Sequence, residues 1–315
     1  MKRHLRNSES GVILLIVLWV VVALGVLAFG FATNIQLGMR SIRNTKDGVS
    51  GYFLAKGAIS ESIFEMMKIS QPDTPQEVGL AFKQQRTAYQ PLSITLETGS
   101  AQCWIENESG KLDLNAGSPA LFRNLLIRQF DVDDSLANDL VNQWEEWRRP
   151  KLDSNGNTQG GPLNSVEELS GLKGMKPEFI YGFWRRAPDG TVEHRRGLLN
   201  LATLYSGSAG INLNDAPLEI LQALPGVTAS EAKAIASART AHFFESIDDC
   251  QQRVPIQFND ESRNLVSIQE STAFAFIASG RAAGSDYERT IRAIVKFGTN
   301  DPLGYRIVYW KDEEI

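Results

Sequence analysis

The most regular pattern in the chain is an apolar run near its N-terminus, from Val12 to Ala32, with no charged residue and no proline. At about 1.5 Å per residue, a helix of this length reaches about 32 Å, enough to cross a bilayer core about 30 Å thick. A short basic leader, MKRHLRNSESG, precedes the run and ends at Gly11. The pattern predicts a membrane-spanning helix at the start of the chain.

The same run also has to be compared with a signal peptide. Signal peptides usually carry about 7 to 15 apolar residues and then a small-x-small cleavage site. This run is longer, and the TNIQL sequence after it offers no such site. The small residue instead precedes the apolar block, so cleavage after Gly11 would leave Val12 at the head of an intact membrane helix. A membrane span with its leader inside is favoured; a plain signal anchor and an atypical signal peptide are the alternatives.

Helical spacing continues past the apolar run, since no proline occurs before Pro72. Ile35, Ile42 and Val49 are seven residues apart, as on one stripe of an amphipathic helix. Glycines in this stretch, such as Gly51, each cost about 1 kcal/mol relative to alanine, so we expect the rod to bend or fray there. The prediction is a long rod; a membrane anchor with a short stalk fits the periodicity equally well.

Alternating apolar and polar residues predict strands on both sides of a more helical middle. Leu92 to Leu96 and Ala101 to Ile105 alternate around a Thr-Gly-Ser turn, which is a hairpin signal. Ala273 to Gly280, Thr290 to Phe297 and Tyr305 to Trp310 are also strand-like. We therefore expect an α+β fold, in which the rod packs on an antiparallel sheet and a large helical domain is inserted after the first strands.

The helical middle contains an internal repeat. The sequence LDLN at 112–115 returns as INLN at 211–214, each followed by a proline and a helical pattern. Further along, SVEEL at 165–169 is answered by SIDDC at 246–250. Each pentamer has serine at a cap position and acidic residues in the first helical turn, where the helix dipole favours them. The repeat predicts a duplicated helical unit.

The second copy carries a helix-hairpin-helix pattern, ILQALPGV at 220–227 followed by Arg239. DNA-binding versions of this motif present backbone N–H groups to phosphate from a hairpin with two glycines. Here Thr228 replaces the second glycine, and Glu231 and Lys233 make the surrounding charge mixed. The pattern favours a Pro-Gly turn between two packed helices, with DNA binding as the alternative.

Composition and charge disfavour several functions. The chain of 315 residues has a formal net charge of −5 and only 3 histidines. An acidic chain is a poor default binder of nucleic acid. HExxH, CxxC, GxSxG and P-loop patterns do not occur, so the usual groups for metal hydrolysis, redox and nucleotide chemistry are missing. Asp113 and Asp215 are better explained as turn and helix-cap residues than as paired catalytic acids, and we expect no enzyme.

Two further sets of residues are candidates for cross-linking or metal binding. Cys103 and Cys250 are the only cysteines, and form either a disulfide or two free buried thiols. Asp153, Asn155 and Asn157 match the first three ligand positions of a D-x-N-x-N calcium loop. The positions where an EF-hand needs glycine and glutamate hold threonine and asparagine, so a surface loop is the alternative.

The leader, its glycine and the rod together resemble type IV pilin-like proteins, whose prepilin peptidase cleaves after such a glycine. Pilins usually have glutamate at the fifth mature position, which counted from Val12 is Ile16 here. That absence, with Trp19 in the string LIVLWVV, resembles the K-type minor pseudopilins of type II secretion, the GspK family. The resemblance covers nearly the whole chain; the N-terminal region and the LxLN and LPG patterns are its most specific parts.

The resemblance implies a non-enzymatic minor pseudopilin that initiates and caps the tip of a periplasmic pseudopilus. It implies a single-pass protein of the bacterial inner membrane with its C-terminal domain in the periplasm and a methylated mature N-terminus. The implied partners are the I- and J-type minor pseudopilins, the major pseudopilin, the inner-membrane assembly platform and the prepilin peptidase. Relatives carry an acid-rich calcium-binding stretch, to which this chain aligns loosely; the corresponding set is Glu146, Asp153, Asn155 and Asn157.

Two other functions stay open from the sequence: a membrane-anchored DNA receptor of the competence type, and a signal-anchored periplasmic scaffold never cleaved at Gly11.

The expected division of the chain is a leader at 1–11, a transmembrane helix at 12–32, its amphipathic continuation at 33–70, the first part of a pilin-like α/β domain at 71–111, an inserted helical domain of two related halves at 112–270, and the last part of the pilin-like sheet at 271–315.

Overall fold

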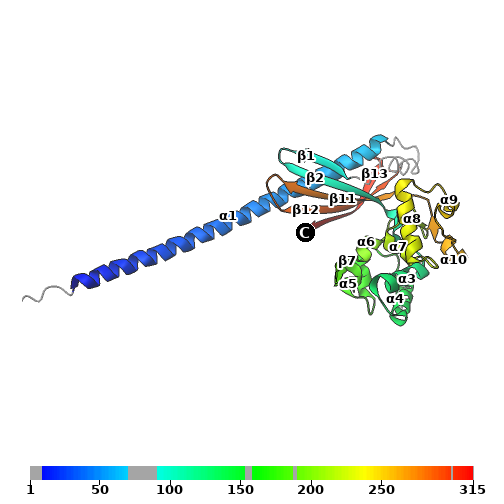
Figure 1. The fold of residues 1–315 in the computed structure, drawn as a ribbon, viewed down its shortest axis with the longest axis horizontal. Helices are drawn as coiled ribbons and strands as arrows, with labels where there is room; N and C mark the ends of the chain where they lie inside the picture. Colours follow the sequence, from blue (N-terminus) through cyan, green and yellow to red (C-terminus); the bar gives the residue numbers. More distant parts are fainter. Residues whose placement is uncertain (1–8, 70–90, 153–157, 187–189, 299–300, 315) are drawn as a thin grey trace, which may run out of the picture.

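The computed structural model describes residues 9–69, 91–152, 158–186, 190–298 and 301–314. Its first element is α1 (Glu9–Ile69), a helix of 61 residues that projects from the head of the molecule as a rod (Figure 1). The expected fraying at glycines is wrong, because α1 runs through them without interruption. One of them, Gly51, packs directly against Gly280 of the sheet, so its missing side chain serves packing.

The C-terminal half of α1 packs on an antiparallel sheet. In the described part of the chain this sheet has five strands in the order β1-β2-β11-β12-β13. Their bounds are Leu92–Leu96 for β1, Gly99–Asn107 for β2, Ala273–Ala282 for β11, Glu288–Phe297 for β12 and Tyr305–Glu314 for β13. All five strands expected from the alternating pattern are confirmed.

The core between α1 and the sheet follows from the two periodicities. On α1, Ala55, Ala58, Ile59, Ile63 and Met66 recur at helical spacing and are buried. Facing them are alternate residues of the central strands, among them Phe274, Phe276, Ile291, Ala293 and Val295. The remaining residues of these strands, such as Arg292 and Ile294, therefore lie on the opposite face of the sheet.

Between β2 and β11 the chain forms a second, mainly helical part with its own core, whose buried residues run from Leu112 to Val266. Its helices are η2 (Glu108–Gly110), α3 (Pro119–Phe130), α4 (Asp134–Trp147), η3 (Val166–Gly171), α5 (Pro177–Tyr181), α6 (Leu198–Leu201), α7 (Leu218–Ala223), α8 (Ala229–Ala241), α9 (Ile247–Arg253) and α10 (Asp260–Arg263). Its short strands are β3 (Leu112–Asp113), β4 (Lys151–Leu152), β5 (Thr158–Gln159), β6 (Gly182–Arg186), β7 (Val192–Arg196), β8 (Ala202–Thr203), β9 (Ile211–Asn212) and β10 (Val266–Ser267).

Figure 1 shows this helical part beside the sheet, on the side of the head away from α1. The two repeat motifs, at 112–115 and 211–214, begin with short strands in this helical part. Strand β3 pairs with β8, and β9 pairs with β10; both pairs are parallel. A hairpin of β6 and β7, which the sequence analysis did not predict, lies between the two copies along the chain. The fold class is thus a long helix on an antiparallel sheet with an attached helical part.

Candidate functional site

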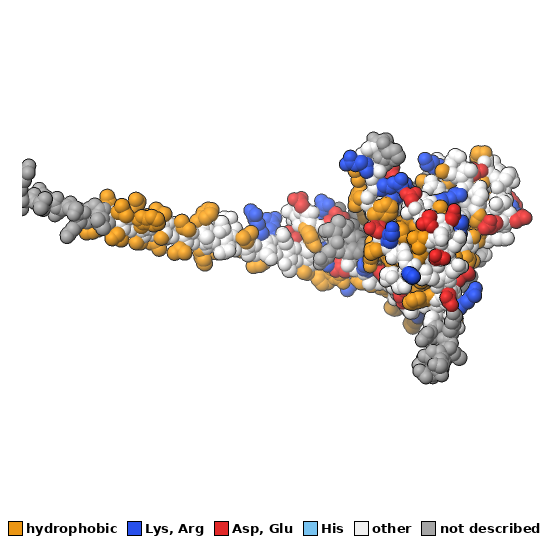
Figure 2. Space-filling view, turned by 90° about the horizontal axis from the view of Figure 1, so that it is seen from below, with side chains coloured by type: hydrophobic (Ala, Val, Ile, Leu, Met, Phe, Trp, Pro, Cys, Tyr) orange, Lys and Arg blue, Asp and Glu red, His pale blue; other side chains and the backbone are white. Residues whose placement is uncertain are grey.

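The N-terminal half of α1 presents the largest unusual surface of the molecule. Every large hydrophobic side chain from Ile13 to Phe31 is more than half exposed. The helix is long and apolar enough to cross a membrane, with a window of mean hydropathy 3.0 that is 0% buried. Figure 2 shows apolar side chains along this part of the rod on the face in view. Such a surface requires lipid or the helices of other subunits around it.

The residues expected to govern processing lie at the start of this surface. Gly11 and Val12 fall in the first turns of α1, which begins at Glu9. Ile16, at the fifth position after Gly11, is 56% exposed and adds an apolar side chain to the rod. Cleavage after Gly11 and the role of Ile16 stay predictions, because both concern the protein in its membrane.

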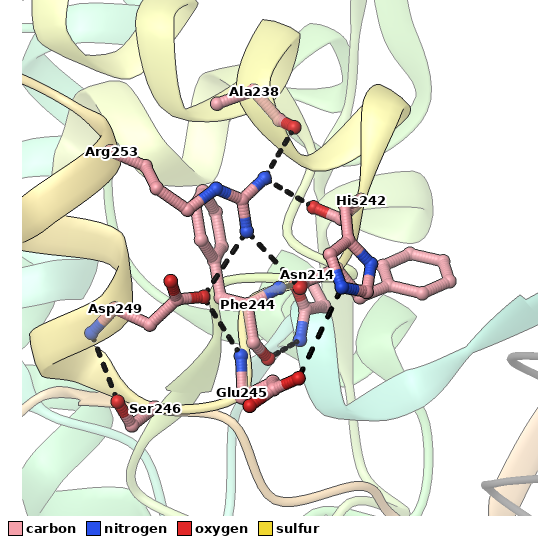
Figure 3. A network of polar contacts seen from close by, with 9 residues as sticks. Asn214, Ala238, His242, Phe244, Glu245, Ser246, Asp249 and Arg253 are labelled. Carbon is pink, nitrogen blue, oxygen red and sulfur yellow. Dashed lines mark hydrogen bonds and ion pairs between the residues drawn. The ribbon is translucent and has the colours of Figure 1, made fainter.

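The repeat motifs build the same contact twice in the helical part. Asn115 accepts a hydrogen bond from the Leu163 backbone N–H at 2.7 Å and donates one to the Leu163 carbonyl oxygen at 3.0 Å. Asn214 pairs with Phe244 in the same way, at 2.8 and 2.9 Å (Figure 3). In each copy, one asparagine side-chain amide therefore pairs with both backbone polar groups of one residue, as a neighbouring strand would, just before the serine shared by the two copies of the repeat.

The residue two positions before each asparagine tightens the turn. Asp113 accepts hydrogen bonds from the backbone N–H groups of Asn115 and Ala116, at 2.8 and 3.0 Å, and Asn212 accepts one from Asn214 at 3.0 Å. Asp113 is thus the turn residue expected from the sequence. Asp215 also lies in a turn, where it accepts a hydrogen bond from the Asn212 side chain at 2.7 Å, and the N-cap of α7 is Pro217. Neither aspartate needs a catalytic explanation.

The serine-capped segments differ between the copies. Ser246 accepts a hydrogen bond from the Asp249 backbone N–H at 2.9 Å and caps α9 as expected. The cap expected at Ser165 is wrong: its side chain makes no cap bond, and the segment after it is the 3₁₀ helix η3. There the Glu168 carboxylate accepts the Asn164 backbone N–H instead, at 3.3 Å. The two copies therefore share the asparagine contact and differ in the serine-containing segment that follows it.

In each copy of the repeat, an arginine side chain stacks on an aromatic ring. In the second copy, Arg253 lies over the Phe244 ring at 4.6 Å and donates to the carbonyl oxygens of Ala238 and His242 (Figure 3). In the first copy, Arg148 lies over the Trp144 ring at 4.1 Å. These guanidinium groups are used to hold chain segments together, in keeping with the structural explanation of the repeat.

The hairpin at 220–227 is a turn between α7 and α8, and its geometry does not favour phosphate binding. Thr228 and Glu231 form a capping box, with the Thr228 backbone N–H donating to the Glu231 carboxylate at 2.8 Å. The Thr228 hydroxyl and backbone N–H hold the pKa of this carboxyl below its usual range. Arg239 donates to the Leu213 carbonyl oxygen at 2.7 Å. The helix start therefore faces a carboxylate of its own chain.

A buried group of charges joins the sheet to the helical part. Glu108 and Lys111 are 0% and 2% exposed, and their side chains are 2.6 Å apart. Lys111 also contacts Glu106 at 3.1 Å, and Arg292 of β12 lies 3.9 Å from Glu108. Burial alone would raise the pKa of Glu106, but Lys111 and Arg292 bring it below its usual range. The close spacing of Glu106, Glu108 and Lys111 along the chain is the signal from which this group could have been predicted.

The structure describes only one residue of the possible calcium site. Glu146 is exposed on α4, while Asp153, Asn155 and Asn157 lie outside the described residues. Within the part of the chain that the structure describes, no group of three or more His, Cys, Asp or Glu side chains could hold a metal ion. Calcium binding stays a prediction.

Cys103 and Cys250 are both free, buried thiols in the structure, so a disulfide between them stays a prediction that the structure does not favour. Cys103 belongs to the core between α1 and the sheet, and Cys250 to the core of the helical part. The second alternative, two free buried thiols, describes the structure. Burial raises the pKa of Cys103 to about 11 and that of Cys250 to about 12.

Comparisons with known proteins agree with the resemblance stated from the sequence. Residues 211–269, which include the second repeat motif and the α7–α8 hairpin, match the model of a family described as "Type II secretion system (T2SS), protein K". No curated protein matches the chain. The match to this family model confirms the K-type resemblance over this segment.

A solved structure extends the likeness to most of the fold. It is a chain from "The Crystal Structure of the GspK-GspI-GspJ complex from enterotoxigenic Escherichia coli Type 2 Secretion System", similar with a TM-score of 0.56 and 15% sequence identity. The similarity covers 84% of this chain and 97% of that chain. At this identity the likeness concerns the fold.

Proposed function

We propose that this chain is a K-type minor pseudopilin of the type II secretion pathway, which initiates and caps the tip of a periplasmic pseudopilus and has no enzymatic activity. One observation carries the proposal: in α1, one half has large apolar side chains that are all more than half exposed, and the other half packs on a sheet. The protein K family match at 211–269 and the K-type fold of the solved structure support the same conclusion.

The proposed mechanism is lateral assembly. The apolar rods of several subunits bundle in and above the inner membrane. Above the membrane, packing removes their exposed apolar side chains from water; within it, the helices gain van der Waals contacts with one another. A carboxylate at the fifth mature position would neutralise the terminal amine of a neighbouring subunit inside such a bundle. Ile16 cannot do so, which suits a subunit with no neighbour ahead of it. The helical part makes the head too bulky to accept another subunit above.

The proposed partners follow from the same assignment. The similar solved structure is named as a complex of GspK with GspI and GspJ, so we propose the I- and J-type minor pseudopilins as direct partners of this chain. The major pseudopilin and the inner-membrane assembly platform are further partners, and a prepilin peptidase removes residues 1–11 and leaves Val12 for methylation. The chain is then a single-pass inner-membrane protein with its sheet and its helical part, 112–270, in the periplasm.

The competence-type DNA receptor is not favoured by the hairpin that suggested it. The N-terminus of α8 is occupied by the Glu231 carboxylate, and Arg239 is directed to a backbone carbonyl oxygen of its own chain. A phosphate at this position would meet a carboxylate, and the net charge of −5 would oppose a polyanion generally.

Co-purification tests the proposal. The tagged full-length chain is co-expressed with I- and J-type pseudopilins of a type II system and purified in detergent. We expect a complex that remains together on size exclusion, whereas a tagged single-span membrane protein of unrelated function retains neither partner. If the chain elutes alone with every I and J pair tested, the proposed function is wrong.

A further inference from the structure

A cavity of about 230 Å³ lies where the sheet meets the helical part. Its sheet side is formed by Arg292 and Ile294 of β12 and by Tyr309 and Lys311 of β13, on the face of the sheet opposite α1. The helical part forms the other side, with residues 165–167 at the start of η3 and residues between 199 and 205, which run from α6 through β8. In Figure 1, α6 lies directly beside the sheet at this place.

Aromatic side chains form much of the cavity wall. Tyr181 of α5, Tyr205 after β8 and Tyr309 of β13 line it, together with aliphatic residues of both parts. Burial, with Glu108 and Glu167 nearby, raises the pKa of Tyr205, so its hydroxyl stays protonated and can donate a hydrogen bond. The wall thus combines aromatic faces with O–H donors, as ligand sites commonly do.

Two cations lie in the same wall and are only partly satisfied by the described residues. Arg292 is 8% exposed; it donates to the Asn200 side chain at 3.2 Å, while Glu108 lies 3.9 Å away, beyond hydrogen-bond distance. The Glu108 oxygen nearest to Arg292 already accepts from Lys111 at 2.6 Å. A guanidinium carries five N–H donors, so Arg292 has donors left for a group in the cavity.

Lys311 brings the second cation to the cavity. Its ammonium group lies 3.8 Å from the Glu167 carboxylate, again beyond hydrogen-bond distance. The lining therefore presents two cations and one carboxylate, Glu167. Two further carboxylates lie near Arg292 outside the lining: Glu108, which is fully buried, and Glu106, whose pKa Arg292 helps to lower. An anionic group entering between Arg292 and Lys311 would gain charge-assisted hydrogen bonds.

We propose that this cavity binds a carboxylate carried on an aromatic or other apolar group, with Arg292 and Lys311 as the cationic contacts and the tyrosines as the walls. Its volume is below the roughly 300–1,000 Å³ of sites for drug-sized ligands, so it suits a group of about one amino-acid residue. A polypeptide ending in an apolar residue and a free aromatic acid share this chemistry. The inference is independent of the assignment as a pseudopilin.

The test uses the full-length chain in detergent and two matched probes, N-acetyl-L-phenylalanine and its amide. They share the apolar body and differ in the carboxylate. By titration calorimetry we expect the acid to bind about tenfold or more tightly than the amide, the factor typical of one hydrogen bond to a charged group. Equal binding of the two probes, or binding of neither, would overturn the proposal.

Variants connect the binding to the named residues. Lys311→Met should abolish most of the preference for the acid, and Arg292→Lys, which keeps the charge but loses the fork of donors, should weaken it. Lys173→Met, on an exposed lysine of the helical part, serves as the matched control. Thermal unfolding shows that each variant is folded. A folded Lys311→Met protein with undiminished preference for the acid would contradict the assignment.

A third probe distinguishes the sources of the carboxylate. A short peptide ending in phenylalanine is titrated with its C-terminus free and then amidated. Binding of the free peptide, lost on amidation, supports a polypeptide terminus as the ligand. Binding of the free amino-acid derivative alone supports a small aromatic acid, and both results agree with the proposed chemistry.

Discussion

Gly51 of α1 and Gly280 of β11 pack backbone against backbone. A Cβ atom on Gly51 would lie 2.7 Å from the Gly280 carbonyl oxygen, and one on Gly280 would lie 2.6 Å from the Ala55 backbone nitrogen. Real Cβ atoms do not approach backbone so closely, so this pair fixes how near the rod lies to the sheet. The contact therefore joins α1 closely to the sheet of the head.

The first prediction uses this contact. Gly51→Ala should lower the free energy of unfolding by about 2 kcal/mol, because the methyl group forces α1 away from β11. Gly57→Ala, at a glycine of the same helix whose Cβ would meet nothing within 4 Å, should instead leave stability unchanged or raise it by up to about 1 kcal/mol. Chemical denaturation of the detergent-solubilised protein measures both. Equal effects of the two substitutions would contradict the close packing.

The second prediction concerns the buried charges at the junction. Lys111→Met should destabilise the protein by about 3 kcal/mol, because Glu108 would stay buried without its nearest cation. Adding Glu108→Gln should recover part of the loss. Lys68→Met, which breaks the exposed Lys68–Glu65 pair, should change stability by less than about 1 kcal/mol. A Lys111→Met protein as stable as the Lys68→Met control would show that the pair is not buried in solution.

The third prediction is a pH dependence at the capping box of α8. The pKa of Glu231 is lowered in the folded protein, so its stabilising contribution is present above the unfolded pKa and is lost as the pH falls through the folded value. The difference in thermal midpoint between wild type and Glu231→Gln should therefore be largest near neutral pH and disappear in acid. Thr228→Ala should cost about 1 kcal/mol. A difference that grows toward acid would have the wrong sign.

The fourth prediction concerns the two thiols. Because burial raises the pKa of Cys103 to about 11 and of Cys250 to about 12, both should resist iodoacetamide at neutral pH in the folded protein. Mass spectrometry should find both alkylated after unfolding without reductant. Two cysteines that stay unlabelled until a reductant is added would instead be joined in a disulfide.

Much of the fold was predictable because it depends on local periodicity. The apolar run, the strand alternation from Leu92 to Trp310 and the LxLN repeat are each visible within a few residues, and each corresponds to an observed element. The serine cap at Ser246 was predictable for the same reason. Ser165 was not, because there the Glu168 carboxylate accepts the Asn164 backbone N–H and the Ser165 side chain makes no cap bond.

Long-range contacts account for what the sequence analysis missed. The partnership of Gly51 with Gly280 spans most of the chain, so Gly51 suggested a weak point of the rod instead of a packing surface. The meeting of Arg292 with Glu108, and of Lys311 with Glu167, likewise depends on how the helical part sits on the sheet. The exposed apolar half of α1 was predictable, because its apolar side chains form one continuous run in the sequence.

The central claim is that the chain is processed and assembled as a pseudopilin, and the mass of the intact protein tests it most directly. The full-length chain is extracted from membranes of cells with and without a prepilin peptidase. The account predicts that the protease removes residues 1–11, so that the mature chain begins at Val12, and that a Gly11→Val variant keeps its leader. A chain of unchanged mass in both cells would contradict it.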